Sequence, residues 1–132
     1  MKAKLEGQFI VKSWNEDVVK EMDRGLKVSH ATVEQEYSGE MHGESHVDYT
    51  MVYFNEGNSR FVGIEVFDGS VNGKKGSFVM KHEGSFENGV VKSDWTVIEK
   101  SGSEKLLTIS GSGNFETAEH GKARYVFFYE LK

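Results

Sequence analysis

The stretch FVGIEVFDGSVNGKKGSFVMKHEG, from Phe61 to Gly84, decides the fold of this sequence. Apolar residues recur at every second position on both sides of Asn72-Gly73, and a period of two is typical of β-strands. Asn-Gly is a strong signal for a two-residue hairpin, because both central positions of a type I′ turn require a positive φ. The stretch therefore predicts two antiparallel strands joined by a tight turn.

The glycines and lysines of this turn also suggest a phosphate-binding loop. A P-loop has four residues between its glycines, a Ser or Thr directly after its lysine, and a helix behind it. Here Gly69 and Gly73 enclose three residues, Lys74 is followed by Lys75, and strand alternation comes next. The segment is therefore interpreted as a turn, and no nucleotide or other cofactor is expected.

The same alternation recurs along the rest of the chain. Short turn signals separate the apolar runs, and connections this short permit only antiparallel neighbours. The sequence contains 15 glycines and no proline, which fits continuous strands joined by tight turns. The eight expected strands cover residues 5–14, 26–40, 47–53, 59–69, 78–86, 91–97, 107–115 and 125–131.

Eight antiparallel strands with one apolar face each are best accommodated by closure, which leaves no strand edge unpaired. We therefore predict an all-β fold, an eight-stranded antiparallel meander β-barrel, in a single domain over residues 1–132. A two-sheet sandwich is the alternative. One segment, NEDVVKEMDRG from Asn15 to Gly25, interrupts the pattern and is predicted to form a short helix or loop.

Composition excludes several classes of protein. The chain has no cysteine, so disulfides, thiolate zinc sites and cysteine nucleophiles are excluded. It has no signal-peptide pattern and no apolar run long enough to span a bilayer, so a cytoplasmic location without a membrane partner is expected. The net charge is −5, with 21 acidic and 16 basic residues interspersed, whereas duplex-binding proteins normally carry a basic patch. A nucleic-acid partner is therefore not expected.

A second polar pattern lies in HGESHVD, residues 42–48. His42, Glu44, His46 and Asp48 alternate, so an extended strand places all four on one face, where they have the chemistry of a divalent-metal site. The opposite register of the segment is apolar and must face the core, which turns these four side chains toward solvent. There they lack the partners that normally fix a ligating histidine, and no metal site is expected.

Two other polar residues fall among apolar neighbours. His82 shares its register with Phe78 and Met80, and Glu65 lies in a strand that is apolar on both sides. A buried carboxylate is normally paired or neutralised. The two residues are either structural partners or groups in a cavity, where buried titratable side chains often mark a catalytic site.

Five segments carry a resemblance that spans nearly the whole chain. They are GxFxVxxW (Gly7 to Trp14), SGExxGES (Ser38 to Ser45), FVGIExFxG (Phe61 to Gly69), GSFVMKHEG (Gly76 to Gly84), and SGS followed by LxxxxGxG (Ser101 to Gly113). In order and spacing they resemble a bacterial family of unknown function that is grouped with the allene oxide cyclase-like β-barrels. The resemblance implies an eight-stranded barrel with an internal pocket, and it implies no established reaction.

Three functions remain open. In the first, the barrel interior binds a small, largely apolar molecule, because small residues leave space that aromatic side chains line. In the second, Glu65 and His82 are the general acid and base of an isomerase or cyclase-like enzyme. In the third, the protein has a structural or assembly role. The expected ligand-binding residues are Tyr49, Ser93, Trp95, Gly111, Tyr125 and Tyr129.

The strand from Phe61 to Phe67 breaks the alternation expected of a barrel, because Val62, Ile64 and Val66 are apolar in its second register. An exposed apolar patch of this kind usually marks an interaction surface. We therefore predict a homo-oligomer. A dimer is favoured, and a trimer comes next, because the plant cyclases to which the resemblance points assemble as trimers. Alternatively, a helix within residues 15–25 folds over this face and covers it.

Overall fold

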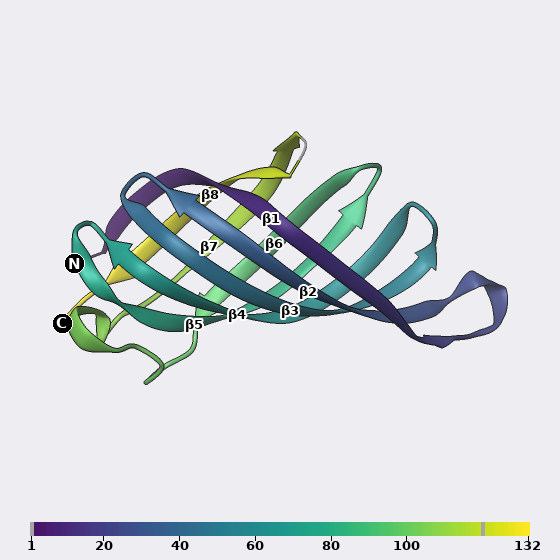
Figure 1. Cartoon of the computed structure of the whole chain (residues 1–132), viewed down its shortest axis with the longest axis horizontal. Helices are drawn as coiled ribbons and strands as arrows, with labels where there is room; N and C mark the ends of the chain where they lie inside the picture. The colour runs from purple at the N-terminus through teal and green to yellow at the C-terminus, as the bar shows by residue number, and fades with distance from the viewer. Residues whose placement is uncertain (1, 120) are drawn as a thin grey trace.

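The computed structural model describes residues 2–119 and 121–132. Its eight antiparallel strands follow one another in a ring, and the last strand pairs with the first, so the sheet closes into a barrel (Figure 1). The predicted eight-stranded meander barrel is confirmed, and the sandwich alternative is wrong. The strands are β1 (Ala3–Glu21), β2 (Lys27–Ser38), β3 (Met41–Asn55), β4 (Asn58–Val71), β5 (Lys74–Glu87), β6 (Val90–Val97), β7 (Ser110–Glu119) and β8 (Lys122–Glu130).

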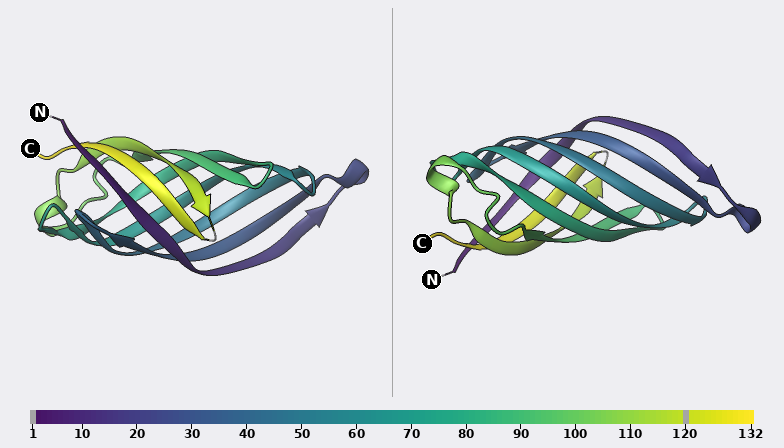
Figure 2. Two further views of the ribbon diagram at one scale, coloured as in Figure 1. Left: turned by 90° about the horizontal axis from the view of Figure 1, so that it is seen from above. Right: turned by 90° about the horizontal axis from the view of Figure 1, so that it is seen from below.

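Tight turns connect the strands at both ends of the barrel. Asn72 and Gly73 join β4 to β5 with φ values of 53° and 81°, which confirms the hairpin predicted from Asn-Gly. The β1–β2, β3–β4, β5–β6 and β7–β8 connections share one end, called the hairpin end here. The termini and the β6–β7 loop lie at the opposite end, called the terminal end (Figures 1 and 2).

The segment from Asn15 to Gly25 is not the predicted helix or loop. β1 continues through it and pairs with β2 as far as Glu21 opposite Lys27, and a single 3-10 turn, η1 (Asp23–Gly25), reverses the chain. The resulting hairpin projects beyond the barrel at the hairpin end (Figure 2). Pairing with β2 satisfies the backbone groups along one edge of this segment, and that tertiary gain outweighs the weak helical spacing of its apolar residues.

The β6–β7 connection closes the terminal end. It contains a second 3-10 turn, η2 (Glu104–Leu106), and Leu106 is fully buried against Gly76 of β5. Leu107, predicted as part of a strand, is instead exposed in this connection, because η2 reverses the chain before β7 begins at Ser110. No helix of the described residues is long and apolar enough to cross a membrane.

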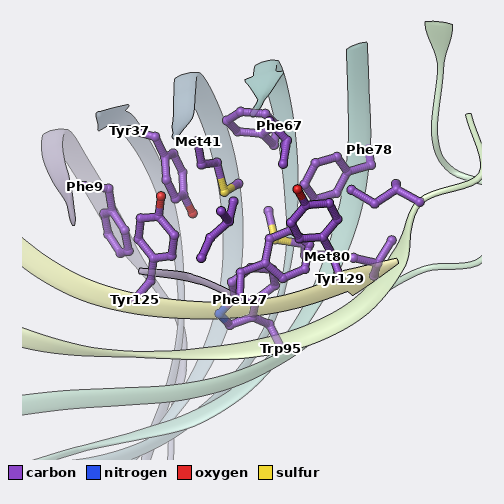
Figure 3. Close-up of a cluster of buried hydrophobic side chains, with 14 of the residues drawn as sticks. Phe9, Tyr37, Met41, Phe67, Phe78, Met80, Trp95, Tyr125, Phe127 and Tyr129 are labelled. Atoms are coloured by element: carbon purple, nitrogen blue, oxygen red, sulfur yellow. The ribbon is translucent and has the colours of Figure 1, made fainter. Parts of the chain in front are cut away.

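Aromatic side chains fill the interior at the terminal end. Phe127 lies at the centre of this core, with its ring centroid 4.7 Å from that of Trp95 and 5.9 Å from that of Phe78. Tyr37 and Phe67 continue the ring contacts around the barrel wall (Figure 3). Such contacts bury large apolar areas and favour tilted or edge-to-face rings. We call this cluster the packed core.

Four interior glycines are each covered by the side chain of the aromatic residue directly opposite on a neighbouring strand. A Cβ added to any of these glycines would lie 2.5–2.6 Å from the nearest ring or hydroxyl atom of its partner, so the aromatic side chain already occupies the space above the glycine. The glycines therefore allow close ring packing and do not open the barrel. The pairs are Gly7–Tyr125, Gly63–Tyr49, Gly84–Phe61 and Gly113–Trp95.

Candidate functional site

The interior at the hairpin end contains a cavity of about 190 Å³. Alternation turns every second residue of the contributing strands inward, and here the inward side chains do not meet across the barrel. Most of the lining is apolar, and the polar side chains among it are few. The lining residues are Phe9, Val11, Trp14, Gln35, Tyr49, Met51, Tyr53, Ser59, Phe61, Phe86, Val91, Phe115, Thr117, Gly121 and Ala123.

A carboxylate organises the rim of this cavity. Glu16 accepts hydrogen bonds from Trp14 Nε1 at 3.0 Å, Ser29 Oγ at 2.7 Å and Tyr53 Oη at 2.8 Å. These contacts join β1, β2 and β3, and they hold Trp14 and Tyr53 where both line the cavity. Trp14 is 46% exposed and stacks on Tyr49 with a centroid separation of 6.2 Å, so it forms part of the boundary between cavity and solvent.

The same contacts change the ionisation of the rim residues. Partial burial raises the pKa of Glu16, but the hydrogen bonds from Ser29, Trp14 and Tyr53 and the nearby charge of Lys27 together lower it by more, so the net shift is downward. Burial and the hydrogen bond to Glu16 raise the pKa of Tyr53 to about 12. Glu16 therefore remains a carboxylate, and Tyr53 a neutral donor, over the whole neutral pH range.

Glu65 and His82, the predicted acid–base pair, are in direct contact. His82 Nε2 lies 2.6 Å from Glu65 Oε1, and the second carboxylate oxygen accepts a hydrogen bond of 2.6 Å from Tyr37 Oη. On its other side, His82 Nδ1 lies 2.9 Å from Ser93 Oγ. These four residues form a buried polar chain that links β2, β4, β5 and β6, and Glu65 and His82 are each 1% exposed. Burial and the adjacent Glu65 carboxylate raise the pKa of Tyr37 well above its usual value.

The buried polar chain does not line the cavity. The rings of Tyr49 and Phe115 both contact His82, at centroid distances of 5.9 Å and 5.8 Å, and both form cavity wall. Glu65 and His82 therefore lie behind that wall. The predicted acid–base pair thus meets inside the barrel, but a molecule in the cavity does not touch either residue.

The predicted ligand-binding residues divide between the two ends of the barrel. Tyr49 lines the cavity, whereas Trp95, Tyr125 and Tyr129 belong to the packed core (Figure 3). Ser93 is the partner of His82 in the buried polar chain. Gly111 faces backbone, because a Cβ there would meet the carbonyl oxygen of Phe128.

Two buried polar residues of the cavity wall, Gln35 and Ser59, were not predicted from the sequence. Both are buried, and both share an inward register with apolar neighbours, Gln35 with Val33 and Tyr37 on β2. A polar residue in an inward register was the signal that identified Glu65 and His82. The same signal, applied to β2 and β4, would have found Gln35 and Ser59.

The outer surface of β3 carries the second polar pattern. His42, Glu44, His46 and Asp48 face outward, as their alternation predicts. His46 lies between two carboxylates, with Nδ1 2.6 Å from Glu34 and Nε2 3.1 Å from Asp48, and the hydrogen bond to Glu34 is the main cause of its raised pKa. Within residues 2–119 and 121–132, no three His, Cys, Asp or Glu side chains are placed to hold a metal ion.

Comparison with known proteins identifies the family of the chain. The model of DUF3224, a family described as proteins of unknown function, matches residues 5–129. The crystal structure of a DUF3224 family protein of unknown function from Shewanella oneidensis MR-1 matches with a TM-score of 0.78 and 20% identity, over 100% of this chain and 99% of that one. At this identity the likeness shows a shared fold alone. No curated protein matches the chain. Since the family model covers nearly the entire barrel, the chain belongs to the DUF3224 family.

Proposed function

We propose that this protein is a cytoplasmic binding protein for a small, largely apolar molecule held at the hairpin end of the barrel. One observation carries the proposal: the interior is packed with aromatic rings at the terminal end and contains an apolar cavity at the other. An eight-stranded barrel has room for side chains or for one small ligand. In this barrel, side chains fill the terminal end, and the hairpin end has room for a small ligand.

The size of the cavity limits the ligand. Engineered apolar cavities of about 150 Å³ bind benzene, whereas pockets for drug-sized ligands start at roughly 300 Å³. A cavity of about 190 Å³ therefore suits a molecule with a single ring or a short alkyl chain. The sequence resemblance to the allene oxide cyclase-like barrels, which have an internal pocket, supports the same proposal.

The acid–base alternative has weaker support. Glu65 and His82 lie within hydrogen-bonding distance of each other, but general acid–base catalysis also requires contact with the substrate. The rings of Tyr49 and Phe115 stand between this pair and the cavity. The contacts favour a structural role in which the pair holds β4 and β5 together inside the barrel.

Self-association is a second, separate proposal. The outward side chains of Val62, Ile64 and Val66 on β4 are between 42% and 52% exposed. Residues 15–25 do not cover this face, because they form the hairpin that projects from the end of the barrel. A second copy of the chain, in a dimer, is the covering we propose. Sedimentation at micromolar concentration tests it, and a monomer of 14.9 kDa would contradict it.

The binding proposal is tested by titrating the protein with ethylbenzene, a neutral single-ring probe, while ¹⁵N–¹H NMR spectra are recorded. We expect saturable shifts confined to the strands that line the cavity. Ala123 is buried in the cavity wall, and Ala123→Leu fills the space and should abolish binding. Arg124→Leu adds the same side chain at the next position, on the outer face of β8, and should leave binding unchanged. Equal binding by both variants, or no binding by the native protein, would refute the proposal.

A further inference from the structure

One amide group in the cavity wall has an unused donor. Gln35 is 3% exposed and lines the cavity. Its Oε1 accepts a hydrogen bond of 3.2 Å from Ser45 Oγ. The Nε2 group makes no hydrogen bond to any residue that the structure describes. An amide nitrogen can only donate, so the unused Nε2 donor is available to a molecule in the cavity.

Two hydroxyl groups in the same wall also have unused hydrogen-bond donors. Tyr49 and Ser59 line the cavity and are buried, and neither hydroxyl has a hydrogen-bond partner within the described part of the chain. The donors at the rim differ, because Trp14 and Tyr53 are already bonded to Glu16. The deeper part of the cavity therefore presents hydrogen-bond donors to a bound molecule. Because the Nε2 group of Gln35 can only donate, the ligand group that bonds to it must be an acceptor.

The depth of Gln35 determines how a ligand would lie. On β1 its partner is Val11, whereas the rim residue Trp14 pairs with Val33, nearer the tip of the projecting hairpin. A group that accepts from Gln35 thus lies inside the barrel, and the apolar remainder of the molecule extends toward Trp14 along Met51 and Phe61.

The charged groups around the cavity narrow the class of ligand further. Lys, Arg and His are missing from the described lining residues, and the Glu16 carboxylate occupies the rim. A ligand carboxylate would be desolvated without a counter-ion and would face a like charge on entry. A neutral acceptor avoids both costs.

We propose that the ligand is a neutral apolar molecule with one hydrogen-bond acceptor, such as a ketone, aldehyde or ester carbonyl, which accepts a hydrogen bond from Gln35 Nε2. This inference rests on the proposed function, since it assigns the ligand class of the same cavity. It adds a binding residue and a direction of hydrogen bonding that an apolar cavity alone does not require.

Two probes of similar shape separate these claims. Acetophenone carries a carbonyl where ethylbenzene carries a methylene, so their dissociation constants compare ligands with and without the acceptor. We expect the native protein to bind acetophenone about tenfold more tightly, which corresponds to about 1.4 kcal/mol. The Gln35 side-chain amide signals should shift on addition of acetophenone and show a nuclear Overhauser effect to its methyl group.

The chain offers a matched pair of variants. Gln35→Met keeps the length of the side chain and removes the donor, so it should erase the preference for acetophenone and retain ethylbenzene binding. Gln8→Met makes the same change at the other glutamine of the chain, which is exposed on β1, and should preserve the tenfold preference.

The outcomes distinguish failure of the Gln35 assignment from failure of the binding proposal. Equal affinity of the native protein for the two probes overturns the assignment to Gln35 and leaves the binding proposal standing. The same holds if Gln35→Met keeps the preference, or if the amide signals of Gln35 do not respond to acetophenone. Failure of both probes to bind refutes the binding proposal and this inference together.

Discussion

The two ends of the barrel are built from the same eight strands and use their interior differently. At the terminal end, rings from β4, β5, β6 and β8 meet across the interior, and Leu106 covers them from the β6–β7 connection. At the hairpin end the connections are mostly tight turns, and the inward side chains stop short of each other around the cavity. Closure of the sheet thus does not by itself fill the barrel. The terminal end is filled because aromatic rings meet across it and the β6–β7 connection covers them.

Polar groups show a second contrast, between the buried polar chain and the cavity wall in front of it. In the buried polar chain, each side chain from Tyr37 to Ser93 has a hydrogen-bond partner. In the cavity wall, Gln35, Tyr49 and Ser59 keep donors without a partner in the described structure. Satisfied groups stabilise a fold, whereas unsatisfied groups facing a cavity are available to a ligand. The buried polar chain therefore contributes to stability, whereas the cavity wall in front of it offers groups for binding.

The largest effect should come from removing matched rings from the two ends. Phe78 and Phe86 both lie on the inward face of β5, but Phe78 is fully buried in the packed core and Phe86 is half-buried at the cavity. Phe78→Ala should lower the free energy of unfolding by about 4 kcal/mol, and Phe86→Ala by about 1–2 kcal/mol, because less surface is lost from a partly open site. Urea denaturation measures both. Equal losses would show that the two ends are packed alike.

A somewhat smaller effect should follow from breaking the buried polar chain. Glu65→Leu leaves His82 without its carboxylate partner and should cost about 3 kcal/mol of folding stability. The double variant with His82→Phe should recover part of that loss, because it removes the unpaired imidazole but still leaves the buried Tyr37 hydroxyl without its acceptor.

The double variant also tests whether the buried polar chain affects binding in the cavity. Since Glu65 and His82 lie behind the cavity wall, its affinity for ethylbenzene should match that of the native protein. If the double variant folds but no longer binds ethylbenzene, the buried polar chain and the cavity are coupled, which would contradict this prediction.

The smallest effect should be an acid-induced change confined to the rim. The pKa of Glu16 is lowered from its ordinary value of 4.5, so its hydrogen bonds stabilise the folded state fully above that pH and are lost as the pH falls through the lowered value. The indole N–H signal of Trp14 should then shift with a midpoint below pH 4.5, while that of buried Trp95 stays constant. Glu16→Gln should abolish the transition. A Trp95 signal that moves with the same midpoint would contradict a local change.

The sequence predicted the barrel because its decisive signals are local. Alternation with a period of two and the turn at Asn72-Gly73 depend on neighbouring residues, and both survive in the structure. The same alternation predicted His82 on the interior face, and it surrounded Glu65 with apolar residues in both registers. Their contact follows from register, since β4 and β5 pair along their whole length and bring the two side chains together.

The location of the cavity depends on contacts across the barrel, which alternation does not encode. Trp95 and Tyr125 have the inward register of cavity residues, yet the rings opposite them fill the space. The glycines expected to open the interior, such as Gly63 and Gly84, do the reverse, because a neighbouring ring lies over each. The extension of β1 beyond the barrel was missed for a related reason: it depends on pairing with β2, a contact that the local sequence of the segment does not reveal.

The pairing of β1 with β8 also has a consequence for how the barrel assembles. Every other strand pair joins neighbours in the sequence, so seven hairpin-like units can form from local segments. The closing pair joins Leu5 to Phe127, about 120 residues later, and the entropy of closing such a loop costs about 4 kcal/mol beyond a constant. A chain emerging from the ribosome can therefore form an open, curved sheet early, but the first strand keeps a free edge until the last strand has been synthesised.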